Sequence, residues 1–156
     1  FMTKLEKLNF IEFLHTKSQR GQRILGICLG AHVLFNYSEE DNVVQGLGLI
    51  QGRVRQISGT SSNTGWLPFK FDKRLMHELW KSQRQNAFRK LKVNGRVFFN
   101  HNYGIMLEEH VDIDVKIQSK ELLEFSALIH KENIIACQFH PEKSQLTGEI
   151  LLKMIL

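Results

Sequence analysis

Apolar and polar positions along the chain follow spacings that predict alternating helices and strands. An apolar stripe facing charged positions predicts an amphipathic helix over residues 2–16. The short apolar run at 23–28 follows a turn at Gly21 and predicts a strand that is buried on both faces. Helical spacing resumes at Leu29. The first quarter of the chain is therefore predicted to contain a helix, then a strand that turns tightly into a second helix.

The rest of the chain is predicted to contain more strands than helices. The predicted strands cover 46–58, 65–71, 96–103, 111–119, 122–130 and 134–140. The last two are joined by a turn at 131–133 and predict a hairpin, while helices are predicted within 75–91 and over 146–155. Because the chain has no repeats, low-complexity tracts or linker, the pattern indicates a single α/β domain.

Composition and length favour an ordinary globular protein. The 156 residues are 42% hydrophobic and 24% charged, and a chain of this length buries enough surface to form a core without metal or disulfide. No apolar run approaches the roughly 18 residues that would suggest a membrane span, and no signal peptide is recognisable at the N-terminus. We therefore expect a cytoplasmic protein that does not bind a membrane.

Cysteine content and charge further narrow the classes of protein to which the chain could belong. Cys28 and Cys137 are the only cysteines, and neither lies in a CxxC or another zinc-like spacing, so we expect reduced thiols with neither a metal nor a cofactor. The formal charge of +5 is compatible with an anionic partner. The basic residues are scattered, however, and no nucleic-acid-binding motif accompanies them, so binding to nucleic acid is not expected.

One cysteine stands where the predicted strand turns into the predicted helix. Gly26-Ile27-Cys28-Leu29-Gly30 has the form G-x-C-x-G, the cysteine version of a nucleophile elbow, in which glycines permit a sharp turn. A thiol at a helix N-terminus is favoured as thiolate, and the Leu29 amide is placed to donate to an oxyanion. A small buried cysteine between glycines that permit close packing would explain the same motif.

A histidine that could act as the base appears in the segment "CQFHPEKS". His140 and Glu142 are two residues apart at the end of an extended run, so their side chains point the same way. A histidine can take the thiol proton and return it to a leaving amine, while a carboxylate on its other ring nitrogen fixes its tautomer. Together with the elbow cysteine, this motif predicts a Cys28-His140-Glu142 triad.

The segments "GICLG", "GLGLIQGRV" and "FHPEKSQ" resemble the class I glutamine amidotransferases, and within them the glutaminase subunits of imidazole glycerol phosphate synthase. The resemblance covers the whole chain and implies a flavodoxin-like three-layer domain with a largely parallel sheet and a C-terminal β-hairpin. It implies Cys28 as nucleophile, His140 as base and acid, and Glu142 as the group that orients His140. The implied substrate-binding residues are Leu29, Gly30, His32, Glu40, His101, Asn102 and Tyr103.

The implied reaction is hydrolysis of glutamine to glutamate and ammonia through a cysteine thioester. The ammonia would pass to a (β/α)8-barrel cyclase subunit in a heterodimer that serves histidine biosynthesis. The sequence departs from the family pattern at His32, where the family has glutamine, at Asn102, where it has serine, and at 63–69. The family's first strands and its oxyanion segment have no counterpart, so we expect residues 1–156 to be an N-terminally incomplete amidotransferase domain.

These departures leave other functions open. The chain could be a paralogous amidotransferase subunit for surface-polysaccharide sugar amidation. It could be an interaction subunit whose catalysis is impaired by His32 and Asn102, in which case glutamine binding would be absent while the partner still bound. A hydrolase using the same triad on γ-glutamyl or peptide bonds would turn over without a partner.

Overall fold

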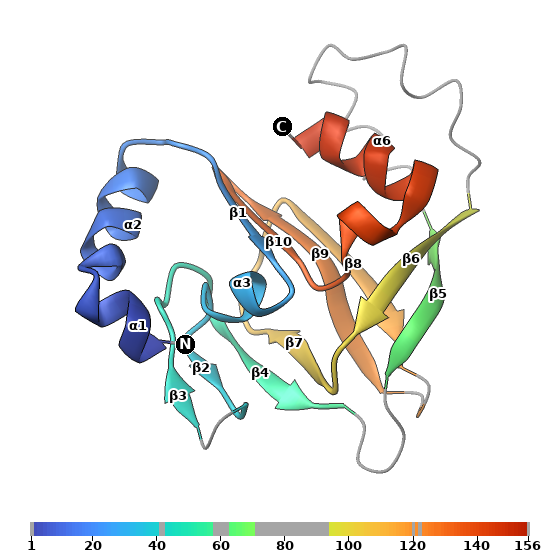
Figure 1. The fold of residues 1–156 in the computed structure, drawn as a ribbon, viewed down its shortest axis with the longest axis horizontal. Coiled ribbons are helices and arrows are strands. Elements are labelled where there is room, and N and C mark those ends of the chain that lie inside the picture. The colour runs from blue at the N-terminus through green and yellow to red at the C-terminus, as the bar shows by residue number, and fades with distance from the viewer. Residues whose placement is uncertain are drawn as a thin grey trace.

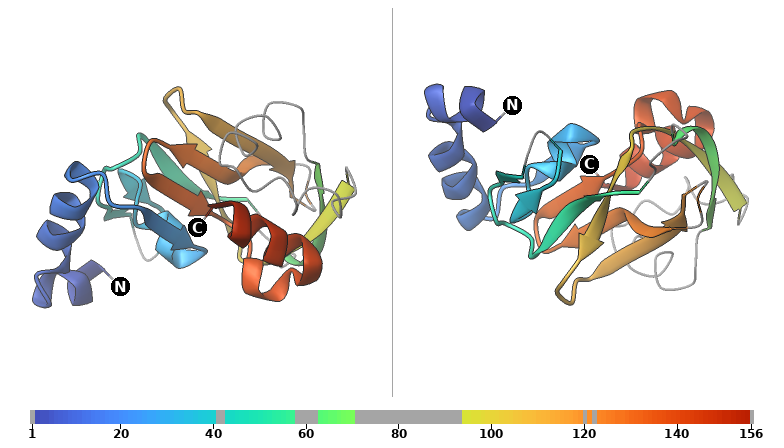
Figure 2. Two further views of the ribbon diagram at one scale, coloured as in Figure 1. Left: turned by 90° about the horizontal axis from the view of Figure 1, so that it is seen from above. Right: turned by 90° about the horizontal axis from the view of Figure 1, so that it is seen from below.

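The chain folds into an α/β structure around a curled, mixed β-sheet. The computed structural model describes residues 2–40, 43–57, 63–70, 94–119, 121 and 123–155. Two N-terminal helices lie at one end of the molecule and the C-terminal helix lies toward the other, with the sheet between them (Figure 1). The same separation is visible from above and from below (Figure 2).

The helices match the predicted ones in place but not always in length. They are α1 (Met2–Lys7), α2 (Phe10–Gln19), α3 (Leu29–His32) and α6 (Gln145–Ile155), with a 3-10 turn, η1 (Pro141–Lys143). The single helix predicted over 2–16 is interrupted, because Asn9 adopts a left-handed conformation with φ 54° that ends α1. The helix predicted within 75–91 falls outside the described residues.

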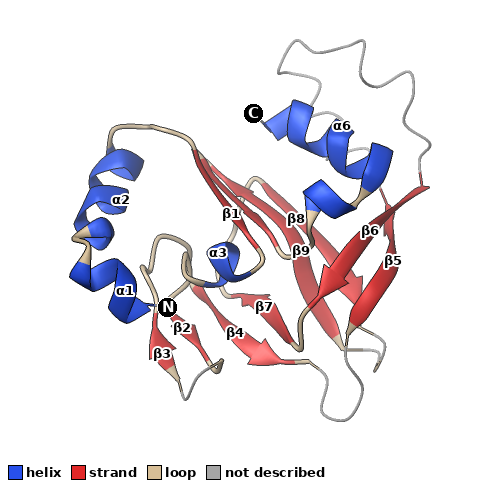
Figure 3. Ribbon diagram, in the orientation of Figure 1, coloured by secondary structure: helices blue, strands red, loops and turns tan. Residues whose placement is uncertain are grey.

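The strands of the described residues form two sheets. They are β1 (Ile24–Ile27), β2 (Tyr37–Ser38), β3 (Val44–Gln45), β4 (Gly52–Gln56), β5 (Thr64–Lys70), β6 (Asn94–Asn100), β7 (Tyr103–Leu107), β8 (Ile113–Gln118), β9 (Glu124–Lys131) and β10 (Ile134–Cys137). The large sheet has the order β1-β10-β9-β7-β4-β2-β3, with β8 paired to β9, and β5 pairs with β6 separately. Figure 3 shows the β5–β6 pair beside the large sheet, and α3 in front of the large sheet.

The predicted α/β class and C-terminal hairpin are confirmed, but the described sheet is mixed rather than largely parallel. Only β1–β10 and β2–β4 are parallel among the described pairs. A tight connection forces an antiparallel pair, since a two-residue turn can only return the chain antiparallel to itself. The turn between β9 and β10 is of this kind, and its Glu132 has φ 53°.

Several predicted strands are shorter than the sequence pattern suggested, and two of them differ from it most. The strand predicted at 46–58 is ordered as β4 only, because the residues before it hydrogen-bond to the chain after α3, as when Leu49 N–H donates to the Leu34 carbonyl. The strand predicted at 96–103 breaks at His101 and Asn102. The part before this break pairs with β5 and the part after it pairs with β4, so one apolar run serves two sheets.

Two clusters of buried apolar side chains hold these elements together. One joins the β5–β6 pair to β8, β9, β10 and α6 and contains the fully buried Phe69, Phe99 and Phe139. The other packs the chain after α3 against β4, β7, β9 and β10, with Phe35 and Ile50 fully buried. Because β9 and β10 contribute to both clusters, these two strands lie between them. In the described part of the chain, no helix has the length and apolar character needed to cross a membrane.

Candidate active site

The predicted elbow is present between β1 and α3. Cys28 has φ 50° and ψ −111°, a conformation that non-glycine residues adopt rarely and that marks functional positions. Its N–H donates to the Cys137 carbonyl at 2.8 Å, and its own carbonyl accepts from the N–H groups of Ala31 and His32. A Cβ on Gly26 would lie 2.5 Å from the Gly30 carbonyl oxygen, so the bend requires glycine there. The chain is thus fixed on both sides of the thiol.

The sheet brings the cysteine and the histidine to one edge. β1 and β10 run parallel with Ile27 opposite Cys137, so both strands end at the same edge. Cys28 follows β1 directly, and His140 comes three residues after β10 ends. The two halves of the predicted triad, 112 residues apart in sequence, therefore approach each other through a single strand pairing.

His140 and Glu142 are in contact as their spacing predicted. Nδ1 of His140 lies 2.7 Å from Oε1 of Glu142, with the histidine largely buried and the carboxylate half exposed. Ser144 connects this segment to β6, because its hydroxyl donates to the His140 carbonyl and accepts from the Phe98 N–H. The His140 N–H in turn donates to the Phe98 carbonyl at 2.8 Å. β6 thus holds the backbone of the histidine in place.

The thiol of Cys28 is held protonated more firmly than its position at a helix N-terminus suggested. Burial raises its pKa above the ordinary value of 9.0, and this outweighs the opposite effect of the hydrogen bond from the Leu29 amide. The negative charges of Glu40 and Glu142 raise the pKa further, which places both carboxylates within electrostatic reach of the sulfur. The expectation of a favoured thiolate is corrected, since desolvation disfavours the charged form. Such a thiol needs a base to remove its proton.

Three more of the predicted residues gather behind the elbow. His32 is buried, with Nδ1 2.9 Å from Oε2 of Glu40 and Nε2 2.9 Å from Oε1 of Gln138. The ring of His101 meets the ring of His32 edge to face at 6.4 Å. Burial and the nearby His32 lower the pKa of His101 to about 4, so this ring is neutral at pH 7. Glu40 and His140 also act on this pKa, so His101 lies among the other site residues.

The remaining predicted residues lie in two places: Leu29 and Gly30 in α3, and Asn102 and Tyr103 at the start of β7. Leu29 is exposed and, together with His32 and Glu40, lines a cavity of about 40 Å³ beside the elbow. Gly30 lies in α3, with open space where a side chain would stand. The Asn102 carbonyl accepts from the Ile57 N–H and its side-chain oxygen accepts from the Asn63 N–H. Tyr103 opens β7 opposite Gln56.

Sequence reasoning missed Gln138, which is fully buried and contacts the His32 ring. A polar residue inside the apolar run 134–139 was the available signal, because a buried amide needs a hydrogen-bond partner. Cys137, one residue earlier, is fully buried in the apolar core, and burial raises its pKa well above the ordinary value. Cys137 is therefore a core residue.

Comparison with known proteins agrees with this geometry. A model of the class-I glutamine amidotransferase family matches residues 6–153 of the chain. The chain belongs to the class-I glutamine amidotransferases. The prediction of an enzyme of this class is thereby confirmed.

Individual relatives and a solved structure extend the match. The chain is 33% identical over 159 residues to imidazole glycerol phosphate synthase subunit HisH of Lactococcus lactis, covering 99% of this chain and 72% of the relative. It is 36% identical over 157 residues to the HisH subunit of Geobacter metallireducens, covering 97% and 71%. A crystal structure of a glutamine amidotransferase superposes with a TM-score of 0.62 at 12% identity, covering 97% of this chain and 70% of the other. This likeness confirms the fold.

The raised pKa of Cys28 predicts how this amidotransferase reacts with an alkylating agent. Because the thiolate is the reactive form, we expect iodoacetamide to modify Cys28 slowly at pH 7 and the rate to keep rising beyond pH 9.0. Cys137 should stay unmodified until the chain is unfolded in urea, since it is fully buried. Peptide mass spectrometry after timed alkylation measures both rates. A Cys28 rate that levels off below pH 8 would contradict the raised pKa.

Proposed function

We propose that the chain is the glutaminase subunit of an imidazole glycerol phosphate synthase, which hydrolyses glutamine and supplies the ammonia to a synthase partner. The observation that carries this proposal is the placement of Cys28 at an elbow on the same sheet edge as the His140–Glu142 pair. The names of the relatives support the particular synthase.

The first half of the reaction follows from these groups. His140 takes the proton of the Cys28 thiol, and the sulfur attacks the side-chain amide carbon of glutamine. The negative oxygen that forms is stabilised by backbone N–H groups, among them that of Leu29, which already donates toward the thiol. His140 then gives its proton to the amide nitrogen, the C–N bond breaks, and ammonia leaves. A γ-glutamyl thioester remains on Cys28.

The second half regenerates the enzyme. His140, neutral again, takes a proton from water, and the hydroxide attacks the thioester carbon. The C–S bond breaks, glutamate leaves, and the proton returns to Cys28. Glu142 accepts the Nδ1 hydrogen bond at 2.7 Å throughout, so Nε2 of His140 stays the nitrogen that exchanges protons with the reactants.

Glu40 is the group we assign to substrate recognition. Free glutamine carries an ammonium group, and an ionised carboxylate is the side chain that complements it. The hydrogen bond from His32 holds the pKa of Glu40 below its ordinary value, so the side chain is ionised at neutral pH. Glu40 also lies on the cavity beside the elbow.

The proposed partner is a (β/α)8-barrel subunit. A second, wider cavity of about 430 Å³ opens between the β5–β6 pair and the start of α6, lined by Trp66, Arg96 and Leu146 among others. It adjoins the triad, because Ser144 both lines this cavity and bonds to His140. A partner seated there would receive ammonia close to where it is formed. The described cysteines are free, which is in keeping with the cytoplasmic location we include in this proposal.

The dependence of turnover on the partner tests the proposal. Glutamate release from glutamine is measured with the chain alone and with the cyclase subunit co-expressed from the neighbouring gene. A synthase subunit should release glutamate faster with its partner and pass the ammonia into the cyclase product. Equal turnover with and without the partner would indicate a free-standing hydrolase, and would contradict the proposal.

Substitution of Leu146 tests whether the partner binds at the wider cavity. The side chain is exposed and lines the wider cavity, so Leu146→Glu should bury a charge in the interface and raise the Kd for the partner at least about tenfold. Leu8→Glu is the matched control, because Leu8 is also an exposed leucine but lies between α1 and α2 at the far end of the molecule (Figure 1). Titration calorimetry measures both. Equal Kd values for the two variants would place the partner elsewhere.

A further inference from the structure

The ring of His32 joins three parts of the site that lie far apart in sequence. Its side chain is only 2% exposed, and both ring nitrogens are engaged, Nδ1 with Glu40 and Nε2 with Gln138, each at 2.9 Å. Its backbone N–H donates to the Cys28 carbonyl at 3.1 Å. A ring held in this way is not free to turn toward a ligand. The ring instead fixes the positions of the Glu40 and Gln138 side chains that it contacts.

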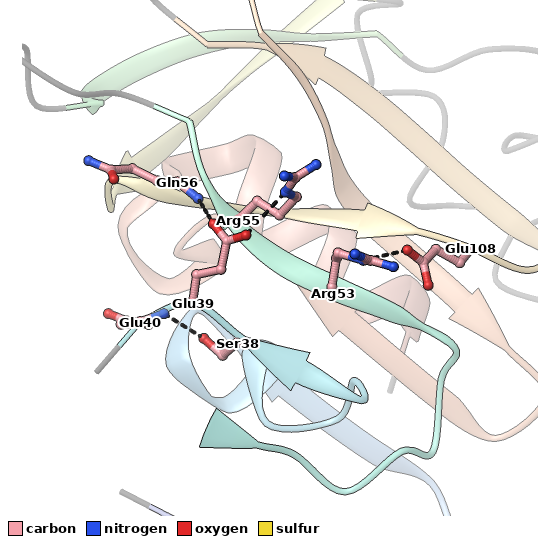
Figure 4. A network of polar contacts seen from close by, with 7 residues as sticks. All are labelled: Ser38, Glu39, Glu40, Arg53, Arg55, Gln56 and Glu108. Atoms are coloured by element: carbon pink, nitrogen blue, oxygen red, sulfur yellow. Dashed lines mark hydrogen bonds and ion pairs between the residues drawn. The ribbon is translucent and has the colours of Figure 1, made fainter. Parts of the chain in front are cut away.

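The turn that carries Glu40 is already fastened from its outer side. The neighbouring Glu39 accepts hydrogen bonds from Arg55 Nε and the Gln56 N–H, each at 3.2 Å, while the Glu40 N–H donates to the Ser38 hydroxyl (Figure 4). The Glu39 N–H also donates to the Val54 carbonyl. These contacts hold the backbone of the turn. They leave the direction of the Glu40 carboxylate to be set by His32.

Gln138 anchors the other side of the ring. Its side chain is fully buried, and its Nε2 has no hydrogen-bond partner in the part of the chain that the structure describes. The contact between its Oε1 and His32 therefore carries the hydrogen bonding that is seen for this amide. Breaking it would leave a buried polar group unsatisfied, which is costly. The Gln138 N–H bonds to the Ala127 carbonyl in β9, so the anchor is fixed to the central sheet.

We propose that His32 is a positioning residue for substrate binding, which holds the Glu40 carboxylate against the sheet through Gln138 so that it meets the ammonium group of glutamine. The proposal rests on the proposed function, and it assigns to the unusual histidine a role through Glu40 rather than a contact with substrate. A group that acts on binding and not on the reacting atoms changes KM and leaves kcat nearly unchanged.

Two substitutions of His32 separate this role from a merely structural one. Asn places its side-chain nitrogen where Nδ1 lies and so keeps a donor for Glu40, whereas Leu fills the space with no donor. In the full chain with its partner, His32→Leu should raise the KM for glutamine about tenfold, the effect of losing one charge-assisted hydrogen bond. His32→Asn keeps this donor but loses the contact with Gln138, so its KM should rise by about threefold, less than in His32→Leu, and kcat should change less than about threefold in both variants.

Glu39→Gln is the matched control, because it alters a carboxylate on the same turn that bonds to Arg55 and Gln56 instead of His32 (Figure 4). Its KM should stay within about twofold, as expected for an exposed ion pair. Thermal unfolding shows whether each variant is folded. A folded His32→Leu variant with unchanged KM, or a folded His32→Asn variant as impaired as His32→Leu, would overturn the positioning role. A fall in kcat at constant KM would overturn it as well.

A second readout keeps this inference apart from the proposed function. Glutamine bound at the site should protect Cys28 from iodoacetamide, and the glutamine concentration for half-protection reports binding without turnover. If Cys28-dependent glutamate release fails but His32→Leu still raises this concentration about tenfold, the proposed reaction falls and the positioning role stands. If release is normal but half-protection and KM are unchanged in His32→Leu, only the positioning role falls. If glutamine neither reacts nor protects, both fall.

Discussion

Replacing Cys28 by alanine should reduce glutamate release from glutamine by about 10⁴–10⁶-fold, because no other group can form the thioester on which both halves of the reaction depend. The substitution removes one sulfur from a half-buried position and leaves the backbone bonds of residue 28 to Cys137, Ala31 and His32 in place. The folded structure and partner binding should therefore persist. Coupled-enzyme detection of glutamate in the complex measures the loss.

Cys137→Ala is the matched control for this substitution. Cys137 is fully buried in the apolar core, so its truncation should lower stability by about 1 kcal/mol but leave glutamate release within a few-fold. Measurable release by the Cys28→Ala variant at more than a hundredth of the normal rate would remove Cys28 from the mechanism. So would a loss of activity in Cys137→Ala alone, if that variant is folded.

Gly148→Ala should cause a large loss of stability. A Cβ at this position in α6 would lie 1.9 Å from the Pro141 carbonyl oxygen, a backbone atom that cannot move aside without shifting the turn between His140 and Glu142. Such a clash costs about 3 kcal/mol, which for a domain of this size lowers Tm by roughly 6–12 °C. Activity should fall as well, since the shifted turn carries two residues of the proposed triad. Thermal unfolding and glutamate release measure the two effects.

Gly30→Ala provides the stability control. It also places an alanine in a helix, but a Cβ there has open space around it, and alanine favours helix over glycine by about 1 kcal/mol. Its Tm should be equal or slightly higher. A Gly148→Ala variant whose Tm matches that of Gly30→Ala would show that the start of α6 does not pack against the His140 segment as the structure has it.

Local features of the fold and site could be predicted from the sequence because short-range sterics determine them. The bend at Cys28 follows from Gly26, which must lack a side chain for the helix to approach the strand. The contact between His140 and Glu142 was predicted from their spacing, but it forms across a 3-10 turn at Pro141–Lys143 and not along the extended run expected from the sequence. The apolar runs predicted the strands β1 and β10, and their parallel pairing explains how two distant motifs meet. β10 is buried as expected, whereas β1 lies at the edge of the described sheet and its apolar side chains are only partly buried, so the prediction that it is buried on both faces was wrong.

Other features depend on contacts that no local pattern contains. The apolar run 96–103 gave no sign that it would break at His101 and divide between two sheets. The break at Asn9 uses a left-handed conformation inside an uninterrupted helical spacing. The bond between His32 and Gln138 spans 106 positions, so neither residue's surroundings could be read from its neighbours. The pKa of Cys28 depends on burial, which outweighs the local effect of the helix N-terminus.

The most direct test of the proposed glutaminase is to look for its covalent intermediate. The chain in complex with its partner is mixed with glutamine, quenched in acid within milliseconds to seconds, digested, and analysed by mass spectrometry. We predict a γ-glutamyl group on the peptide that contains Cys28, present during turnover and absent once glutamine is consumed. Steady glutamate release with no adduct on Cys28, or with the adduct on another residue, would contradict the assignment of Cys28 as the nucleophile.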